Sequence, residues 1–138
     1  WANFLAKVCS QWVKHHNGRE LKDFKIIKSW IVRQFKNEYN PAHHHTGHIS
    51  GVGYLKVPDN LGTTSQKNKS VNQNGKLELI DSSPKLMCRG NYIVKPEVGD
   101  FYLFPAYLLH TVYPFSGSDD ERRSVSFNAA LDPLAASL

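Results

Sequence analysis

Two spacings of hydrophobic residues divide the chain into a helical start and a longer β-rich part. Over residues 1–18 the apolar side chains recur every three or four positions, as in an amphipathic helix, and Asn17 and Gly18 provide a stop. From residue 26 onward, short runs are rich in β-branched and aromatic residues, which favour strands. The pattern therefore predicts a helix, then a helical or irregular stretch over 20–23, and then strands. We expect residues 1–24 to pack as a helical segment on the strands.

The predicted strands are short and are separated by Pro, Gly and Asp clusters. They cover residues 26–27, 29–35, 49–57, 76–80, 91–95, 101–104, 108–113 and 124–130. Residues 36–41 are predicted as a turn because they contain Asn37, Asn40 and Pro41. Residues 58–75 are polar, with few hydrophobic side chains, and are predicted as a long exposed loop. Many short strands at this spacing are typical of a β sandwich or a small barrel.

Composition limits the classes of protein that fit. The 138 residues suit a single domain covering 1–138, and 41% hydrophobic residues are enough for a packed core. No apolar run approaches the roughly 20 residues of a membrane-spanning helix, and residues 1–18 lack the features of a signal peptide. Cys9 and Cys88 are too few for a disulfide scaffold, so we expect a reduced, cytoplasmic setting. A chain that opens on Trp1 is expected to be a fragment or a processed product, which leaves a missing leader open.

The net charge of the chain permits an anionic partner but does not identify one. Lys and Arg outnumber Asp and Glu by 17 to 12, which gives +5 and permits an anionic partner. The cations are scattered and no nucleic-acid motif is present, so the sequence argues against nucleic acid without excluding it. Nothing in the sequence indicates a membrane partner or an oligomeric state.

Histidine is the unusual component, with seven in the chain and four between positions 43 and 48. In an extended segment His43 and His45 point to the same side, and His44 points away. His110, in an apolar strand, is the obvious third ligand for a facial metal site with open positions. Structural roles remain open: His110 as a satisfied core residue, and the cluster as solvated surface or an incidental zinc or nickel site. The last two, His15 and His16, suit the C-terminal end of the first helix and are assigned no function.

The strand near the C-terminus has a regular polar face. Alternation places four polar side chains on one side, namely Arg122, Ser124, Ser126 and Asn128. If this side points into a barrel, Arg122 needs an anionic partner, and a ligand carboxylate held with the help of Ser124 would fit. If it faces solvent, Arg122 is an ordinary surface charge. The strand alone leaves both interpretations open.

The order of these motifs resembles a known family. Ser50-Gly-Val-Gly-Tyr-Leu55 follows the histidines, Gly99-Asp-Phe-Tyr-Leu-Phe-Pro105 precedes His110, and Arg122-x-Ser-Val-Ser-Phe-Asn128 comes last. Over residues 26–131 this resembles the 2-oxoglutarate/Fe(II)-dependent oxygenases of marine bacteria and their phages, relatives of the prolyl 4-hydroxylase group. The resemblance implies a mainly β fold, a double-stranded β-helix (a cupin-like jelly roll) with a metal at its mouth. It also implies that His43 and His110 bind iron and that Arg122, with Ser124, binds the distal carboxylate of 2-oxoglutarate.

One position departs from the wider superfamily, which has His-x-Asp/Glu where this chain has His45. Three interpretations follow. His45 replaces the carboxylate and completes a three-histidine site; or Asp59, Asp81 or Asp100 reaches the metal; or the register is shifted to His44 or His48. We expect His43, His45 and His110 to be the ligands.

The resemblance implies an Fe(II) dioxygenase that uses O2 and couples decarboxylation of 2-oxoglutarate to succinate with hydroxylation of an unidentified organic or protein substrate. Two other classes compete: a three-histidine, cupin-type metalloenzyme that does not use 2-oxoglutarate, and a non-catalytic jelly-roll binding module. Residues 58–75 are expected to fold over the substrate. Four tyrosines fit either the pocket or the core: Tyr54, Tyr102, Tyr107 and Tyr113.

Overall fold

The computed structural model describes residues 1–64, 66–81, 83 and 86–133. Within these ranges helix α1 (Ala2–Asn17) is followed by eight strands. Their bounds are β1 (Phe24–Gln34), β2 (Asn40–His43), β3 (Ile49–Lys56), β4 (Leu77–Ile80), β5 (Asn91–Val94), β6 (Phe101–Pro105), β7 (Leu109–Val112) and β8 (Arg122–Leu131).

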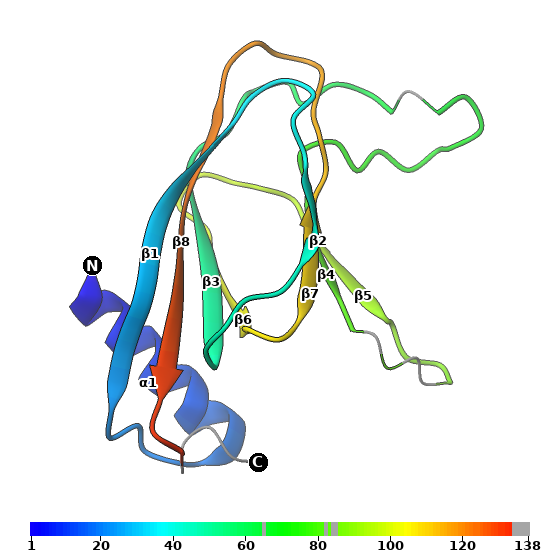
Figure 1. Ribbon diagram of the computed structural model, residues 1–138. Helices are drawn as coiled ribbons and strands as arrows, with labels where there is room; N and C mark the ends of the chain where they lie inside the picture. The colour runs from blue at the N-terminus through cyan, green and yellow to red at the C-terminus, as the bar shows by residue number, and fades with distance from the viewer. Residues whose placement is uncertain (65, 82, 84–85, 134–138) are drawn as a thin grey trace.

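The strands form two antiparallel sheets that face each other (Figure 1). The first sheet has the order β1-β8-β3-β6, and the second has the order β2-β7-β4-β5. Most neighbours in a sheet are distant along the chain, because the chain passes repeatedly from one sheet to the other. This arrangement is the predicted jelly roll, so the fold class expected from the sequence is confirmed.

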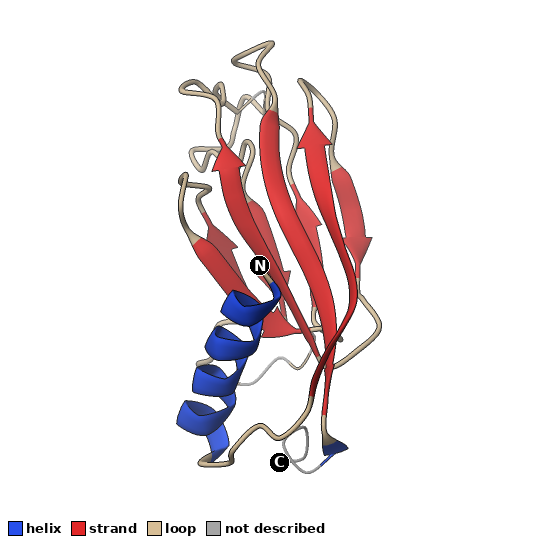
Figure 2. Ribbon diagram, turned by 90° about the vertical axis from the view of Figure 1, so that its left-hand side faces the viewer, coloured by secondary structure: helices blue, strands red, loops and turns tan. Residues whose placement is uncertain are grey.

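Helix α1 covers the outer face of the first sheet (Figures 1 and 2). Its buried side chains Leu5, Cys9 and Val13 pack against Phe127 and Ala129 of β8. The helix ends at Gly18, whose left-handed backbone (φ 73°) lets its N–H donate to the Lys14 carbonyl. The predicted helix and its stop are therefore confirmed. No helix in the described ranges combines the length and apolarity that a membrane crossing requires.

Two local predictions were wrong. Residues 26–27 and 29–34 belong to one strand, β1, which carries a bulge between Ile26 and Lys28 and so changes its side-chain alternation there; Phe35 lies beyond its end. Asn40 and Pro41 were predicted in a turn but lie in β2. Proline is tolerated there because β2 is an edge strand, where one side needs no N–H donor. Residues 18–23 contain no helical turn, so of the two alternatives predicted for 20–23 the irregular one is confirmed.

The glycines of β3 allow the centre of the first sheet to pack closely. A Cβ atom on Gly51 would lie 2.6 Å from the Phe127 ring and 2.8 Å from the Tyr102 carbonyl oxygen. Because real Cβ atoms do not approach backbone this closely, a larger residue would push β3 away from its neighbours. The close packing keeps β3 and β8 in register behind the site described next.

Candidate metal centre

A cavity of about 630 Å³ lies between the two sheets. One wall is the polar face of β8, and Arg122, Ser124 and Ser126 of that face are all buried and line the cavity. The opposite side chains of β8, such as Phe127, pack under helix α1. The question left open by the sequence is therefore answered: the polar face points inward.

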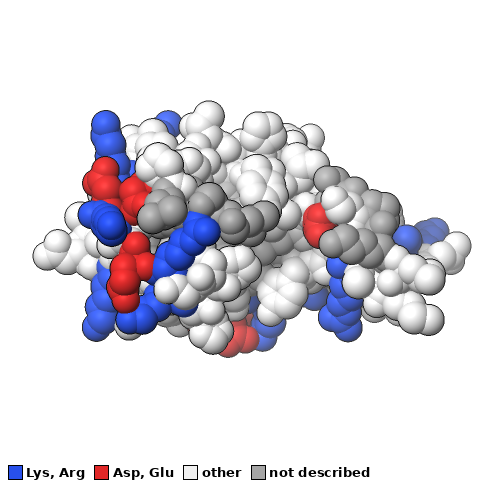
Figure 3. All heavy atoms as spheres, turned by 90° about the horizontal axis from the view of Figure 1, so that it is seen from below, with Lys and Arg blue, Asp and Glu red and all other residues white. Residues whose placement is uncertain are grey.

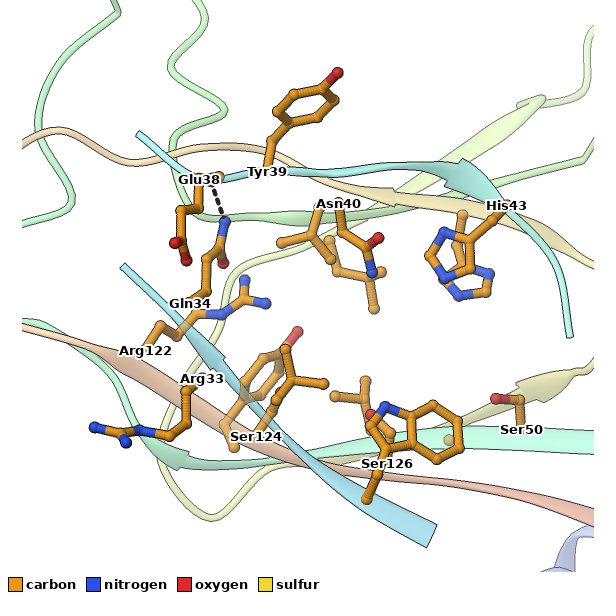
Figure 4. A pocket seen from close by; sticks show the side chains of 18 of the residues that line it. Arg33, Gln34, Glu38, Tyr39, Asn40, His43, Ser50, Arg122, Ser124 and Ser126 are labelled. Atoms are coloured by element: carbon orange, nitrogen blue, oxygen red, sulfur yellow. Dashed lines mark hydrogen bonds between the residues drawn. The ribbon is translucent and has the colours of Figure 1, made fainter. Parts of the chain in front are cut away.

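Three of the seven histidines meet at one end of this cavity (Figure 4 labels His43). His43 ends β2 and is paired in register with His110 of β7, while His45 lies in the loop that follows β2. One nitrogen from each ring lies within 4.8 Å of those of the other two. His44 and His48 are exposed and outside the group, and His48 Nδ1 accepts a hydrogen bond from the Leu131 N–H at 2.9 Å.

Backbone carbonyls orient two of the imidazoles. His43 Nδ1 is 2.6 Å from the Pro41 carbonyl oxygen, and His110 Nδ1 is 3.0 Å from that of Leu108. A nitrogen facing a carbonyl must carry the proton, which leaves Nε2 of each ring with a lone pair for a metal. The Nε2 atoms of His110 and His45 are 3.2 Å apart. Two ligands at right angles on a metal, each at about 2.1 Å, lie about 3.0 Å apart, so the donor atoms fit such an ion.

The surroundings of His45 and His110 keep these two rings uncharged. Burial lowers the pKa of His110 to about 4, and burial together with the neighbouring histidines lowers the pKa of His45. The Phe104 ring lies 5.0 Å from the His110 ring, and the Trp30 ring lies 5.4 Å from the His45 ring. Since neutral imidazole is the form that binds metals, the apolar environment prepares both residues as ligands at neutral pH.

No carboxylate joins the three histidines within the described ranges. Asp100 instead accepts a hydrogen bond from the Tyr102 hydroxyl at 3.1 Å, and Asp81 accepts one from the Ser83 N–H at 3.0 Å. Asp59 borders a separate hollow next to residues 57–62. Of the interpretations left by the sequence, the geometry favours the set of His43, His45 and His110.

The far end of the cavity holds a buried cation (Figure 4). Arg122 is 3% exposed; its Nη1 donates to the Gly75 carbonyl at 2.7 Å, but its Nε has no hydrogen-bond partner. Among the described residues no acidic side chain forms an ion pair with it. Burial lowers the pKa of this guanidinium, yet arginine stays charged in proteins. A buried guanidinium without an acidic partner is a position suited to an anionic ligand.

Two further polar groups at this end lack partners. The Tyr54 hydroxyl is buried without a hydrogen bond, and burial raises the pKa of Tyr54 to about 12. The Tyr54 ring lies 5.6 Å from the Arg122 guanidinium carbon. Gln34 Oε1, on the strand beside Arg122, is also unsatisfied. The sequence pattern does not indicate Gln34 and leaves the role of Tyr54 open, because only the pairing of distant strands brings them to Arg122.

The remaining candidates lie outside the cavity. Tyr102, Tyr107 and Tyr113 do not line it, and Tyr107 is 74% exposed. None of the described residues in 58–75 lines it either, although the Gly75 carbonyl holds Arg122. The loop projects beyond the sheets (Figure 1), where Asn72 and Asn74 side chains donate to the carbonyls of Gly62 and Leu61. Its closing over a substrate stays a prediction.

Surface charge does not single out another site on the face shown in Figure 3. Lysine and arginine side chains are interspersed there with aspartate and glutamate. Several exposed lysines form ion pairs, for example Lys14 with Glu20 and Lys36 with Asp119. On this face, the cationic side chains are therefore part of a mixed surface.

Comparison with known proteins agrees with the fold and with the residues at the site. The model of the family described as "Putative 2OG-Fe(II) oxygenase" matches residues 28–128, so the chain belongs to this family. The family resemblance inferred from the sequence is thereby confirmed. No curated protein sequence matches the chain.

Two solved structures share the fold at low identity. One is an oxidoreductase of the 2OG-Fe(II) oxygenase family from Burkholderia pseudomallei, 15% identical, with a TM-score of 0.60 over 88% of this chain. The other is a Pseudomonas putida prolyl-4-hydroxylase, 16% identical, with a TM-score of 0.55 over 90% of this chain. The matches cover only 51% and 61% of those two proteins, so this chain spans little more than half of their length.

Proposed function

We propose that the protein is an Fe(II)- and 2-oxoglutarate-dependent dioxygenase that hydroxylates an organic or protein substrate. His43, His45 and His110 would hold Fe(II), and Arg122 with Ser124 would bind the distal carboxylate of 2-oxoglutarate. The observation that carries the proposal is a single cavity with three clustered histidines at one end and a buried, unpaired arginine at the other. Family membership supports the same chemistry.

The residues of the chain have three tasks in this proposal. The imidazoles, held by the carbonyls of Pro41 and Leu108, present their free nitrogens to the ion. Arg122 pairs with the carboxylate, and the unpartnered Tyr54 hydroxyl donates a further hydrogen bond to it. The rings of Phe104 and Trp30 beside the histidines limit access of water to the reacting end. When bound, Fe(II) with 2-oxoglutarate and O2 supplies the oxidising chemistry, in which 2-oxoglutarate is decarboxylated to succinate.

The first test measures succinate formation and 2-oxoglutarate affinity. We expect the wild-type protein with Fe(II) to convert 2-oxoglutarate to succinate. We expect Arg122→Ala to bind 2-oxoglutarate about 100-fold more weakly in calorimetry with Mn(II) as an inert metal, because a buried charge pair is lost. Arg123→Ala is the matched control, since Arg123 is adjacent but bonds Glu121 away from the cavity. Undiminished binding by Arg122→Ala would contradict the proposal.

His45 gives one specific reason to keep a second candidate, a three-histidine metalloenzyme that does not use 2-oxoglutarate. Three neutral imidazoles are also a plausible site for such an enzyme, because the metal keeps open positions. That alternative leaves the buried Arg122 without a ligand. Tight metal binding with neither 2-oxoglutarate binding nor succinate formation would favour it.

A further inference from the structure

The side chains on one face of β1 form a continuous row along the cavity. Beyond the bulge at Ile27, alternate side chains of β1 stand opposite the polar face of β8, in the pairs Lys28 with Asn128, Trp30 with Ser126, Val32 with Ser124, and Gln34 with Arg122. Three of the four β1 residues, Trp30, Val32 and Gln34, line the cavity. The row therefore runs from the arginine end past the histidines to Lys28, which lies outside the cavity and is exposed.

Lys28 is connected to the histidine end through Trp30. The Lys28 ammonium lies 5.5 Å from the centre of the Trp30 ring, and the Trp30 ring lies 5.4 Å from that of His45. A cation over the face of an indole ring is held there by the ring's electrons. Ammonium, indole and imidazole thus follow one another from solvent to the candidate metal centre.

Among the described residues, no acidic side chain lines the cavity at the histidine end. Three other cations of the first sheet pair with acids: Arg33 and Arg123 with Glu121, and Lys56 with Asp120. No acidic side chain of the described ranges pairs with Lys28. The acidic residue that lines the cavity, Glu38, lies beside Gln34 at the arginine end (Figure 4).

This distribution has a consequence for the second substrate. A divalent ion held by three neutral imidazoles keeps more positive charge than one held by two imidazoles and a carboxylate. Even with 2-oxoglutarate bound, the histidine end and Lys28 remain positive. The cavity of about 630 Å³ is in the range that accommodates drug-sized ligands, and so has room beyond a five-carbon dicarboxylate.

We propose that the second substrate carries an anionic group, a carboxylate or a phosphate, and that Lys28 and Trp30 bind this group beside the candidate metal centre. This inference rests on the proposed function for the role of the site. In this proposal Lys28 determines substrate specificity, because its ammonium contacts the substrate and not the reacting atoms.

The test uses matched probes that differ in charge. Benzoate and phenyl phosphate represent the two anions, and benzamide is the uncharged counterpart of benzoate. Each is titrated into ¹⁵N-labelled, Zn(II)-loaded protein with saturating 2-oxoglutarate, and into metal-free protein. The signal followed is the indole N–H of Trp30, which is assigned with Trp30→Phe.

We expect at least one anion to shift the Trp30 signal and to bind more tightly than benzamide. Lys28→Gln should lower the affinity for that anion about five-fold, the upper range for an exposed ion pair, and should leave the affinity for benzamide unchanged. Lys28→Arg, which keeps the charge, should restore the affinity. Lys7→Gln makes the same charge change on α1, on the other side of the sheet, and should have no effect.

Two results would overturn the inference: equal affinity for charged and uncharged probes, or equal weakening by Lys28→Gln and Lys7→Gln. Failure of the proposed function gives a different pattern, in which the anions bind through Lys28 but 2-oxoglutarate does not bind. Stronger binding of benzoate than of phenyl phosphate would identify the carboxylate as the preferred group, and the reverse would identify the phosphate.

Discussion

The two sides of the first sheet are both buried, but for different purposes. On the helix side, Phe127 and Ala129 of β8 are apolar, 0% exposed and packed against α1. On the cavity side, the same strand buries Arg122 and Ser124, and the arginine has an unsatisfied N–H. Burial on the helix side stabilises the fold, whereas polar burial on the cavity side costs stability until a ligand binds. Replacing a buried residue on the helix side should therefore lower the stability of the ligand-free protein, whereas replacing the unpaired arginine on the cavity side should raise it.

The largest effect on stability is expected on the helix side. Phe127→Ala should lower the free energy of unfolding by about 3–5 kcal/mol, because it removes a fully buried ring and leaves a cavity. Chemical denaturation measures the change. The control Ile31→Ala, an exposed position on β1, should change stability by no more than about 0.5 kcal/mol. Similar losses in the two variants would contradict the assignment of the core.

Lowering the pH should destabilise the protein through His110, on the cavity side of the structure. The unfolded chain protonates His110 near its ordinary pKa of 6.5, whereas the folded, metal-free protein does so only near about 4. Because the unfolded state binds more protons between these values, stability should fall as the pH drops from 6.5 to 4. The loss is up to about 2 kcal/mol after allowance for solvent screening. Chemical denaturation of the metal-free protein across this pH range measures the loss of stability. An equally steep loss in His110→Asn would contradict the prediction.

Replacing Arg122 should change stability in the opposite direction from replacing Phe127. Arg122→Met is expected to raise the unfolding free energy of the ligand-free protein by about 1 kcal/mol, because it replaces an unpaired buried charge with an apolar chain. The stabilisation that wild type gains from added 2-oxoglutarate should disappear in this variant. Thermal unfolding with and without the ligand measures both. A clear loss of stability would mean that Arg122 is mainly a structural residue.

The smallest effect on stability should come from Tyr54. Tyr54→Phe removes a hydroxyl that has no partner, so unfolding should change by less than about 0.5 kcal/mol. The affinity for 2-oxoglutarate should fall about five-fold, which corresponds to one lost hydrogen bond. Calorimetry of the two proteins side by side provides the measurement, and unchanged affinity would remove Tyr54 from the proposed carboxylate site.

Some of the candidate site could be predicted from local pattern. The spacing of His43 and His45 and the alternation from Arg122 to Asn128 are properties of an extended backbone, and neighbouring residues fix them. The position of Gln34 could not be predicted in this way. It faces Arg122 only because β1 pairs with β8, 88 positions further along the chain.

By itself, the sequence determined the helix, the approximate strands and a short set of candidate residues, because these depend on spacing within a few residues. It also determined the family, through the order of short motifs along the chain. Tertiary structure decided which face of β8 is buried toward the cavity and which packs under the helix. It also decided that His110 joins His43 and His45, that His48 does not, and that β1 is one bulged strand. The reason is physical: each of these outcomes depends on strand pairing between distant segments, and the register of that pairing is set by the packing of both faces at once.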